Sequence, residues 1–216
     1  MPSYKKPTFS ERVQLLADTY VALSKDEQIW DGDLSSGLRH IARACANALG
    51  VSRASVWQLR EDYSSLSCLT LYREDTNQYE QGMQLVAHQY TRYFSALAND
   101  RVIAAHDAQT DPRTREFADI YLRPLNIVSM LDATLRREGK TCGVLCLEET
   151  GLARLWSREE KNFVASVADL ISQLLIINNL RESEARYRAL FDGSGDSVFV
   201  VRNQILYDCN QAALAM

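Results

Sequence analysis

Two alternating apolar segments joined by a short polar turn constrain the fold of this chain most strongly. The segments are Ile127–Leu135 and Cys142–Leu147, and Arg137-Glu138-Gly139-Lys140 lies between them. A glycine-containing polar turn between two apolar runs is typical of a β-hairpin. The helix pattern that follows begins with Ser157-x-x-Glu160, a capping box in which both side chains satisfy free backbone amides. The stretch therefore predicts a sheet covered by a helix.

The rest of the chain predicts further helices and strands around this hairpin. Thr8-x-x-Glu11 is a second capping box, and Gly50 ends a helix that begins after Asp33. After Gly50 the apolar period changes from helical to alternating. The expected strands are 54–59, 67–72, 101–105, 127–135 and 142–147, and the expected helices are 11–24, 34–49, 86–97, 113–121 and 158–180. Because no regular crossover helix separates the strands, we expect an α+β fold with a central antiparallel sheet flanked by helices.

The closing helix carries a wider apolar face than contact with one sheet requires. Phe163, Leu170 and Ile177 recur at seven-residue intervals, which is the spacing of a helix that packs against a partner helix. We therefore expect a homodimer whose seam contains these three residues. The alternative is an ordinary terminal helix that is buried within its own domain.

Composition excludes several classes of partner. The chain has 24 basic and 28 acidic side chains and a net charge of -4, so we expect no nucleic-acid partner. Five cysteines at irregular spacing indicate reduced thiols in a cytoplasmic protein. The longest apolar run, Val164–Leu180, is interrupted by Asp169, Gln173 and two asparagines, so we expect no membrane contact from this chain.

Several segments resemble a known domain family. Arg123–Asp132, the glycines Gly139 and Gly143, and Trp156–Phe163 are similar to the closing third of a GAF domain, and the similarity extends back through Gly37–Val56. The resemblance implies that a GAF sensor domain, with its N-terminal helix, occupies residues 1–180.

The end of the chain resembles a different family. Glu182–Phe191, Gly195–Val200 and Asp208–Ala213 are similar to the first third of a PAS domain. The chain is too short beyond these segments to close a PAS sheet. We therefore expect residues 181–216 to form a linker helix and the truncated start of a PAS domain.

These resemblances imply a regulatory function. GAF and PAS domains accompany histidine kinases, diguanylate cyclases and phosphodiesterases, and they pass signals through dimeric helices. The chain has no phosphoacceptor-histidine helix, no ATP-binding glycine box and no cyclase signature, so it offers no catalytic residues. The resemblance implies a cytoplasmic module that senses a small molecule within a multidomain bacterial signal-transduction protein. The expected parent is a sensor kinase or a cyclic-di-GMP enzyme.

The resemblance places a ligand pocket between the sheet and the middle of the chain. The expected lining residues are Tyr90, Tyr93, Phe94, Phe117, Tyr121, Ser129, Leu131 and Cys146. No Cys-His dipeptide is present for a covalent bilin, and no Asn-Lys pair is present for a cyclic nucleotide. The ligand is therefore unidentified and no cofactor is assigned. The alternative is that these aromatic residues only fill the core.

Thiol chemistry and metal binding are the other candidate functions of this sequence. Cys142 and Cys146 lie four residues apart, about 13 Å along a strand, so they cannot jointly hold a metal or bridge each other. His106, beside Asp107, is the histidine to test for haem or metal, but no two histidines have ligand spacing and no metal site is expected. Two alternatives to a sensor stay open. One is a thiol enzyme of the free methionine sulfoxide reductase type, and the other is a dimerising spacer without a ligand.

Overall fold

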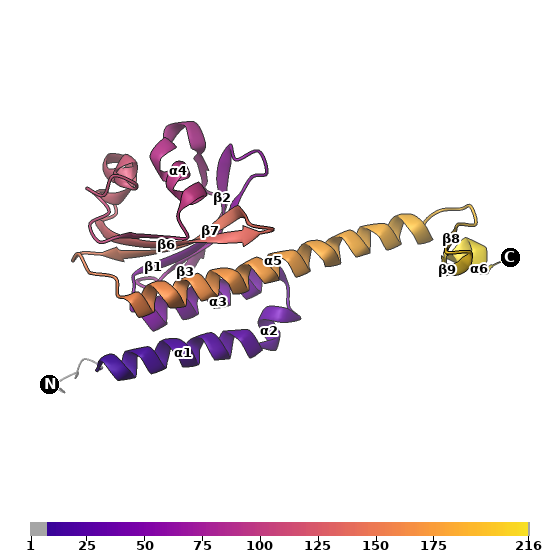
Figure 1. Ribbon diagram of the computed structural model, residues 1–216, viewed down its shortest axis with the longest axis horizontal. Coiled ribbons are helices and arrows are strands. Elements are labelled where there is room, and N and C mark those ends of the chain that lie inside the picture. Colours follow the sequence, from indigo (N-terminus) through magenta and orange to yellow (C-terminus); the bar gives the residue numbers. More distant parts are fainter. Residues whose placement is uncertain (1–7, 216) are drawn as a thin grey trace. The chain divides into compact units, whose positions relative to one another are not determined.

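The computed structural model describes residues 8–215, which form two compact units. The first unit ends at Leu174 and the second begins at Leu175. In the first unit, a seven-stranded antiparallel sheet carries helices on both faces, which confirms the predicted α+β fold (Figure 1). Its strands are β1 (Arg53–Leu59), β2 (Ser65–Arg73), β3 (Gln78–Glu80), β4 (Gln84–Val86), β5 (Val102–Ala105), β6 (Ile127–Arg137) and β7 (Lys140–Thr150). Its helices and turns are α1 (Phe9–Lys25), α2 (Glu27–Trp30), α3 (Leu34–Leu49), η1 (Ala87–Gln89), α4 (Thr91–Asn99), η2 (Arg115–Phe117), η3 (Ala118–Leu122) and the first part of α5 (Arg158–Asp192).

The sheet has the strand order β3-β2-β1-β7-β6-β5, and β4 also pairs with β2. The predicted hairpin is β6 and β7, and both strands extend beyond the predicted bounds. Its turn places Glu138 at φ 52° and Gly139 at φ 77°. Positive φ at both central residues matches the twist of the flanking strands, which favours a two-residue hairpin loop. The turn therefore sets the register in which Arg137 pairs with Lys140.

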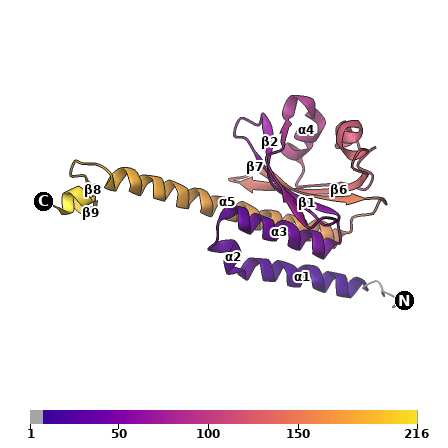
Figure 2. The ribbon, with the colours of Figure 1, turned by 180° about the vertical axis from the view of Figure 1, so that it is seen from behind.

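Helices cover the two faces of the sheet unequally. In both views α3 and the part of α5 before Leu175 lie against one face, α1 lies outside α3, and α4 lies on the opposite face (Figures 1 and 2). Residues of β6 alternate between these faces: Met130 belongs to the core under α4, whereas Leu131 is buried but lies outside that core. Arg101, which directly precedes β5, joins the edge of the sheet to α5, because its guanidinium donates to the Ala165 carbonyl and to Asp169 of α5.

The middle of the chain departs from the two helices predicted there. The predicted helix 86–97 is divided into β4, η1 and α4, and the predicted helix 113–121 consists of a 3₁₀ turn followed by a π-helical turn. The Glu116 carboxylate accepts hydrogen bonds from the backbone amides of Arg92 (2.9 Å) and Tyr93 (3.1 Å). This contact satisfies two free backbone amides in the first turn of α4, and it fixes η2 against α4. Local sequence periodicity does not report such a contact.

Helix α5 corrects the predicted dimer seam. Phe163 and Leu170 are only 6% and 3% exposed, because the part of α5 before Leu175 is the core helix of the first unit. Ile177 is half-buried and lies in the second unit. Residues at seven-residue spacing also lie within the broad apolar stripe by which a helix packs on a sheet. The repeat alone therefore does not distinguish packing against the domain's own sheet from packing against a partner helix.

α5 is also long and apolar enough to cross a membrane by length and composition. Half of its most apolar window is buried inside the protein, and a core helix of a soluble protein passes the same test. The feature is therefore weak evidence for a membrane span.

The second unit contains the rest of α5, the hairpin β8 (Phe199–Arg202) and β9 (Ile205–Cys209), and α6 (Gln211–Leu214). Asn210 organises it: its side chain accepts from the amides of Val198 and Ala213, and donates to the carbonyls of Phe191 and Asp196. Many apolar side chains of this unit are exposed. They include Leu180, Leu190, Phe199, Val201, Ile205, Leu206, Tyr207 and Leu214. An isolated two-stranded hairpin is marginally stable, so this unit depends on its helix for order.

Gly143 is required where β1, β6 and β7 meet. A Cβ at this position would lie 2.3 Å from the Trp57 carbonyl oxygen and 2.9 Å from the Leu135 side chain. Gly143→Ala is therefore expected to lower the free energy of unfolding by about 1–3 kcal/mol, measured by urea titration. Gly195→Ala is the control, because a Cβ there meets nothing within 4 Å. Equal unfolding midpoints for the two variants would contradict this expectation.

Candidate small-molecule site

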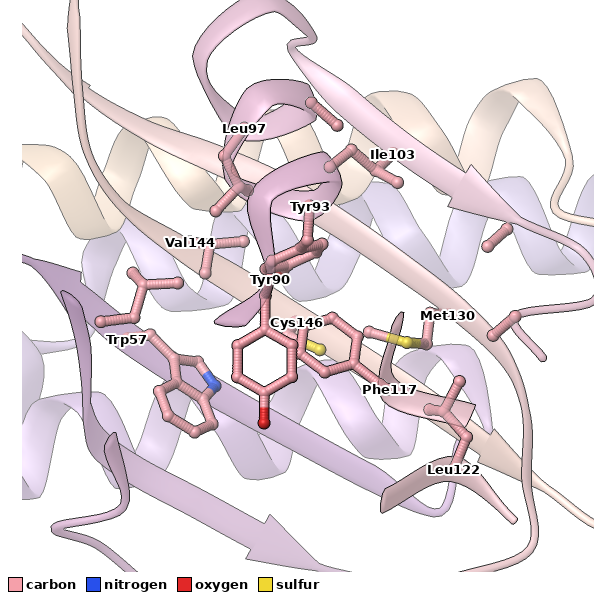
Figure 3. Packing of buried hydrophobic residues seen from close by; sticks show 14 of the residues in the cluster. Trp57, Tyr90, Tyr93, Leu97, Ile103, Phe117, Leu122, Met130, Val144 and Cys146 are labelled. Atoms are coloured by element: carbon pink, nitrogen blue, oxygen red, sulfur yellow. The ribbon is translucent and has the colours of Figure 1, made fainter. Parts of the chain in front are cut away.

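A cavity of ≈ 290 Å³ lies on the face of the sheet that α4 and the η2–η3 segment cover. The residues that line it are Trp57, Leu66, Met83, Gln84, Leu85, Tyr93, Phe117, Tyr121, Met130, Val144, Cys146 and Glu148. Figure 3 shows the rings of Tyr90, Tyr93 and Phe117 facing Trp57 on one side and Met130 on the other. The cavity is mainly apolar with few polar groups, which is the usual composition of a small-molecule site.

Four of the predicted pocket residues lie on the cavity wall: Tyr93, Phe117, Tyr121 and Cys146. The other two predicted aromatic residues support this wall from behind. The Tyr90 ring lies 4.5 Å from the Phe117 ring between centroids, and the Phe94 ring lies 6.3 Å from the Tyr93 ring. Some rings of this aromatic cluster therefore line the cavity, and the others pack in the core beside it.

Ser129 and Leu131 do not line the cavity, which corrects the prediction for β6. The hydroxyl of Ser129 donates to the His106 carbonyl and accepts from the Arg154 amide at the end of the sheet. Leu131 is completely buried but does not belong to the core around the cavity. Successive strand residues point to opposite faces, so an error of one residue in phase exchanges the two faces. Met130 occupies the wall instead.

Sequence reasoning missed most of the sheet residues of the wall, including Trp57, Val144 and Glu148. The alternation of residues in β1 and β7 is the signal that could have placed Trp57 and Val144 on the cavity wall. In β7, Val144 lies two residues before Cys146, which is predicted on the pocket face, so both side chains point to the same side of the sheet. Glu148 lies one residue beyond the predicted end of its strand, and nothing local marked it as buried. Met83 and Gln84 lie at the sheet edge in a segment with no predicted strand.

A buried ion pair forms the polar end of the cavity. The Arg53 Nε donates to Glu148 Oε2 at 2.7 Å, and the Tyr121 hydroxyl donates to the same oxygen at 3.1 Å. Burial raises the pKa of Glu148, and the neighbouring Arg53 acts in the opposite direction. Arg53 also donates to the Tyr121 hydroxyl at 3.1 Å. Tyr121 therefore ties η3, which covers the cavity, to the sheet.

A second buried carboxyl group lies next to the wall. The Tyr93 hydroxyl donates to Asp132 Oδ2 at 2.6 Å, and Asp132 Oδ1 has no hydrogen-bond partner in the described structure. Burial raises the pKa of Asp132 to about 7. The thiol of Cys146, which pairs across the strands with Asp132, is also buried, and burial raises its pKa well above the usual range. Cys146 is thus held in the thiol form, which is a poor nucleophile.

The described residues contain no group of three or more His, Cys, Asp or Glu side chains that could hold a metal ion. His106 has a structural contact instead: its Nδ1 accepts a hydrogen bond from the Trp156 amide at 3.1 Å. Cys142 is half-exposed, and burial still raises its pKa. All five cysteines are free thiols.

The fold is an α+β domain with a cavity between an antiparallel sheet and the segments covering one of its faces. Comparison with protein families gives this class a name. The GAF domain model matches residues 33–175, and the chain belongs to the GAF domain family. Among curated proteins, none matches the chain in sequence.

Solved structures share this fold at low sequence identity. The GAF domain of the phosphoenolpyruvate-protein phosphotransferase from Acinetobacter is 11% identical with a TM-score of 0.60, and the match covers 80% of this chain and 97% of that one. Free methionine-R-sulfoxide reductase from Neisseria meningitidis, in complex with its substrate, is 12% identical with a TM-score of 0.58, covering 84% and 99%. The blue-light absorbing PixJ GAF domain from Thermosynechococcus elongatus is 16% identical with a TM-score of 0.56, covering 82% and 95%. At these identities the similarity shows the fold alone.

Proposed function

We propose that this chain is a regulatory GAF module that senses a small molecule within a multidomain bacterial signal-transduction protein. The observation that carries the proposal is the ≈ 290 Å³ cavity, which aromatic and methionine side chains line beside one buried carboxylate. Packed protein cores leave few spaces of this size, which favours a ligand in the cavity. GAF domains of similar fold include a blue-light absorbing one from PixJ and one from a phosphoenolpyruvate-protein phosphotransferase.

The proposed organisation follows the sequence. Residues 1–180 form the sensor domain with its N-terminal helix, and residues 181–216 form a linker helix and the truncated start of a PAS domain. The module itself lies in the cytoplasm, and its parent is a sensor histidine kinase or a cyclic-di-GMP enzyme. The sequence segments that resemble a PAS domain, and the hairpin of β8 and β9, support this assignment.

Signalling through a dimeric helix is part of the proposal, with a different seam from the one that the sequence suggested. Within the second unit, Ile176, Leu180, Tyr187 and Leu190 of α5 are exposed and, with Ser183, follow the alternating three- and four-residue spacing of a coiled coil. Apolar residues on an otherwise polar and exposed helix favour a partner helix. Burial of one such side chain contributes roughly 1.5–3 kcal/mol.

The seam is tested by mass in solution. Leu180→Glu combined with Leu190→Glu is expected to convert a dimer into a monomer, because four carboxylates would meet at the interface. Ala185→Glu combined with Ala189→Glu is the matched control, since it adds the same charge to exposed positions away from the seam. A native chain that is monomeric at high concentration, or a seam variant that stays dimeric, would contradict the proposed seam.

The ligand site is tested by thermal unfolding with a panel of small metabolites. A ligand at 100 times its Kd adds about 2.7 kcal/mol to the unfolding free energy, which raises the Tm by roughly 5–10 °C for a domain of this size. Val144→Phe fills the cavity and is expected to abolish that rise. Leu152→Phe, which enlarges a side chain that is 83% exposed, should leave it unchanged. If no compound raises the Tm, or Val144→Phe retains the rise, the cavity is not a ligand site.

We propose that the module acts without catalysis. A free methionine-R-sulfoxide reductase has a similar fold, so a thiol enzyme is the alternative to test. Burial raises the pKa of both Cys142 and Cys146, which opposes thiolate formation. Turnover of free methionine sulfoxide that is lost in Cys142→Ser or Cys146→Ser would favour the enzyme. The spacer alternative requires the cavity to stay empty, so the metabolite panel also tests it.

A further inference from the structure

From the walls of the cavity we infer the class of its ligand: an uncharged bicyclic aromatic molecule that donates one hydrogen bond to Glu148. This inference rests on the proposed function, because it takes the cavity to be a ligand site. Size, wall chemistry, charge and one free acceptor atom each contribute to it.

Size sets the number of rings. A dry apolar cavity of about 150 Å³ is filled by benzene, which has six non-hydrogen atoms. The cavity here is ≈ 290 Å³, about twice that volume. It therefore accommodates two fused rings with a small substituent, about 11 non-hydrogen atoms in all.

The wall chemistry favours a flat aromatic body. Trp57, Tyr93, Phe117 and Tyr121 all contribute to the lining, and aromatic rings attract one another in offset or edge-to-face contacts at 4.5–7 Å. Phe117 and Tyr93 already make such a contact, with 4.9 Å between centroids and 76° between ring planes. The thioethers of two methionines complete the lining, and sulfur contacts ring edges favourably.

The charges around the cavity exclude ionic ligands. Within the described residues, the lining contains one carboxylate, Glu148, and no lysine, arginine or histidine. An anion would therefore meet a like charge and no free cation. A cation is disfavoured as well, because the Arg53 guanidinium already pairs with Glu148 at 2.7 Å and lies 5.8 Å from the centre of the Tyr121 ring. A neutral molecule leaves this pair balanced.

One acceptor atom of the ion pair remains for the ligand. The Glu148 side chain is 3% exposed, and within the described residues both hydrogen bonds that it accepts, from Arg53 and Tyr121, reach Oε2. Oε1 of the same carboxylate accepts no hydrogen bond from the described residues and is not one of their fully buried unpaired atoms, so it is open to a donor from the cavity. A hydroxyl or ring N–H at the polar end of a bicyclic ligand supplies a hydrogen bond to this charged acceptor when the ligand displaces water.

The test is calorimetric titration of the chain, residues 1–216, at pH 7 with four naphthalene derivatives that differ in one group. They are 2-naphthol, 2-methoxynaphthalene, 2-naphthoate and 2-(aminomethyl)naphthalene. We expect 2-naphthol to bind at least about 10-fold more tightly than 2-methoxynaphthalene, because only the former donates to a charged acceptor. The anionic and cationic compounds should bind more weakly than 2-naphthol.

Three variants, one of them a control, locate the binding site and the hydrogen bond. Val144→Phe should abolish binding of 2-naphthol, whereas Leu152→Phe should not change it. Glu148→Gln keeps the shape of the side chain but removes the charge of the acceptor. It should reduce the preference for 2-naphthol over 2-methoxynaphthalene, while circular dichroism reports that the fold is retained.

The outcomes separate the ligand class from the proposed function. Equal affinity for 2-naphthol and 2-methoxynaphthalene, or tighter binding of either charged compound, overturns the ligand class but leaves the cavity as a binding site. The absence of binding by all four compounds also overturns the ligand class. In that case the metabolite panel with Val144→Phe still decides whether the cavity is a sensor site.

Discussion

The Arg53→Met variant is expected to lose about 3–5 kcal/mol of unfolding free energy, because it leaves the buried Glu148 carboxylate without its cation. The two side chains are 9% and 3% exposed and lie 2.7 Å apart. Tyr121 alone cannot replace the guanidinium, since its hydroxyl supplies one neutral hydrogen bond at 3.1 Å. Urea titration of the native protein and the variant measures the loss.

Two controls distinguish this effect from a general loss of charge. Arg53→Met combined with Glu148→Met should recover most of the loss, because an apolar pair has no unpaired charge to bury. Arg73→Met removes a partner of Asp75 at an exposed site, where an ion pair contributes at most about 1 kcal/mol. If Arg53→Met costs no more than Arg73→Met, the buried pair does not have the role assigned to it.

The second large effect expected is a pH dependence of stability that originates at Asp132. Burial raises its pKa to about 7 in the folded protein, whereas the unfolded chain has the ordinary value near 4. Between these values the folded protein holds one more proton than the unfolded chain, so its stability falls as the pH rises. The slope from this group reaches about 1.4 kcal/mol per pH unit. Below about pH 4 and above about pH 7 the group contributes no slope.

Asp132→Asn removes this ionisation and retains a group that can accept the hydrogen bond from Tyr93. Urea titrations of both proteins at pH 5 and pH 7.5 give four unfolding free energies. The variant should gain stability relative to the native protein as the pH rises between these values. A difference between the two proteins that is the same at both pH values would show that Asp132 ionises normally in the fold.

The sequence predicted the sheet well where apolar residues alternate and turns are marked. The hairpin of β6 and β7 and the capping box before α5 both rely on local signals, and the structure contains both. The middle of the chain was predicted less well, because η2 and α4 are fixed by the distant contact of Glu116 with the amide of Tyr93. Local periodicity carries no information about such a contact.

The candidate site was only half predictable for a related reason. Aromatic residues such as Phe117 and Tyr121 were expected in the pocket on the basis of family resemblance and residue type, and they line it. Ser129 and Leu131 were placed on the wrong face, because a single sequence does not fix the phase of a strand that is buried on both faces. The seven-residue repeat predicts a partner helix for Phe163 and Leu170, but both residues are buried within their own domain.

The measurement that tests the cavity most directly is NMR of the chain with ¹³C-labelled methionine methyl groups. The sequence has four methionines: Met83 and Met130 line the cavity, and Met1 and Met216 are its first and last residues. Titration with 2-naphthol and, separately, with 2-methoxynaphthalene should shift the Met83 and Met130 signals to saturation with at least one compound. In the Val144→Phe variant the Met83 and Met130 signals should stay in place. Unchanged Met83 and Met130 signals with both compounds, or equal shifts in the native protein and in Val144→Phe, would contradict binding of a bicyclic aromatic molecule in this cavity.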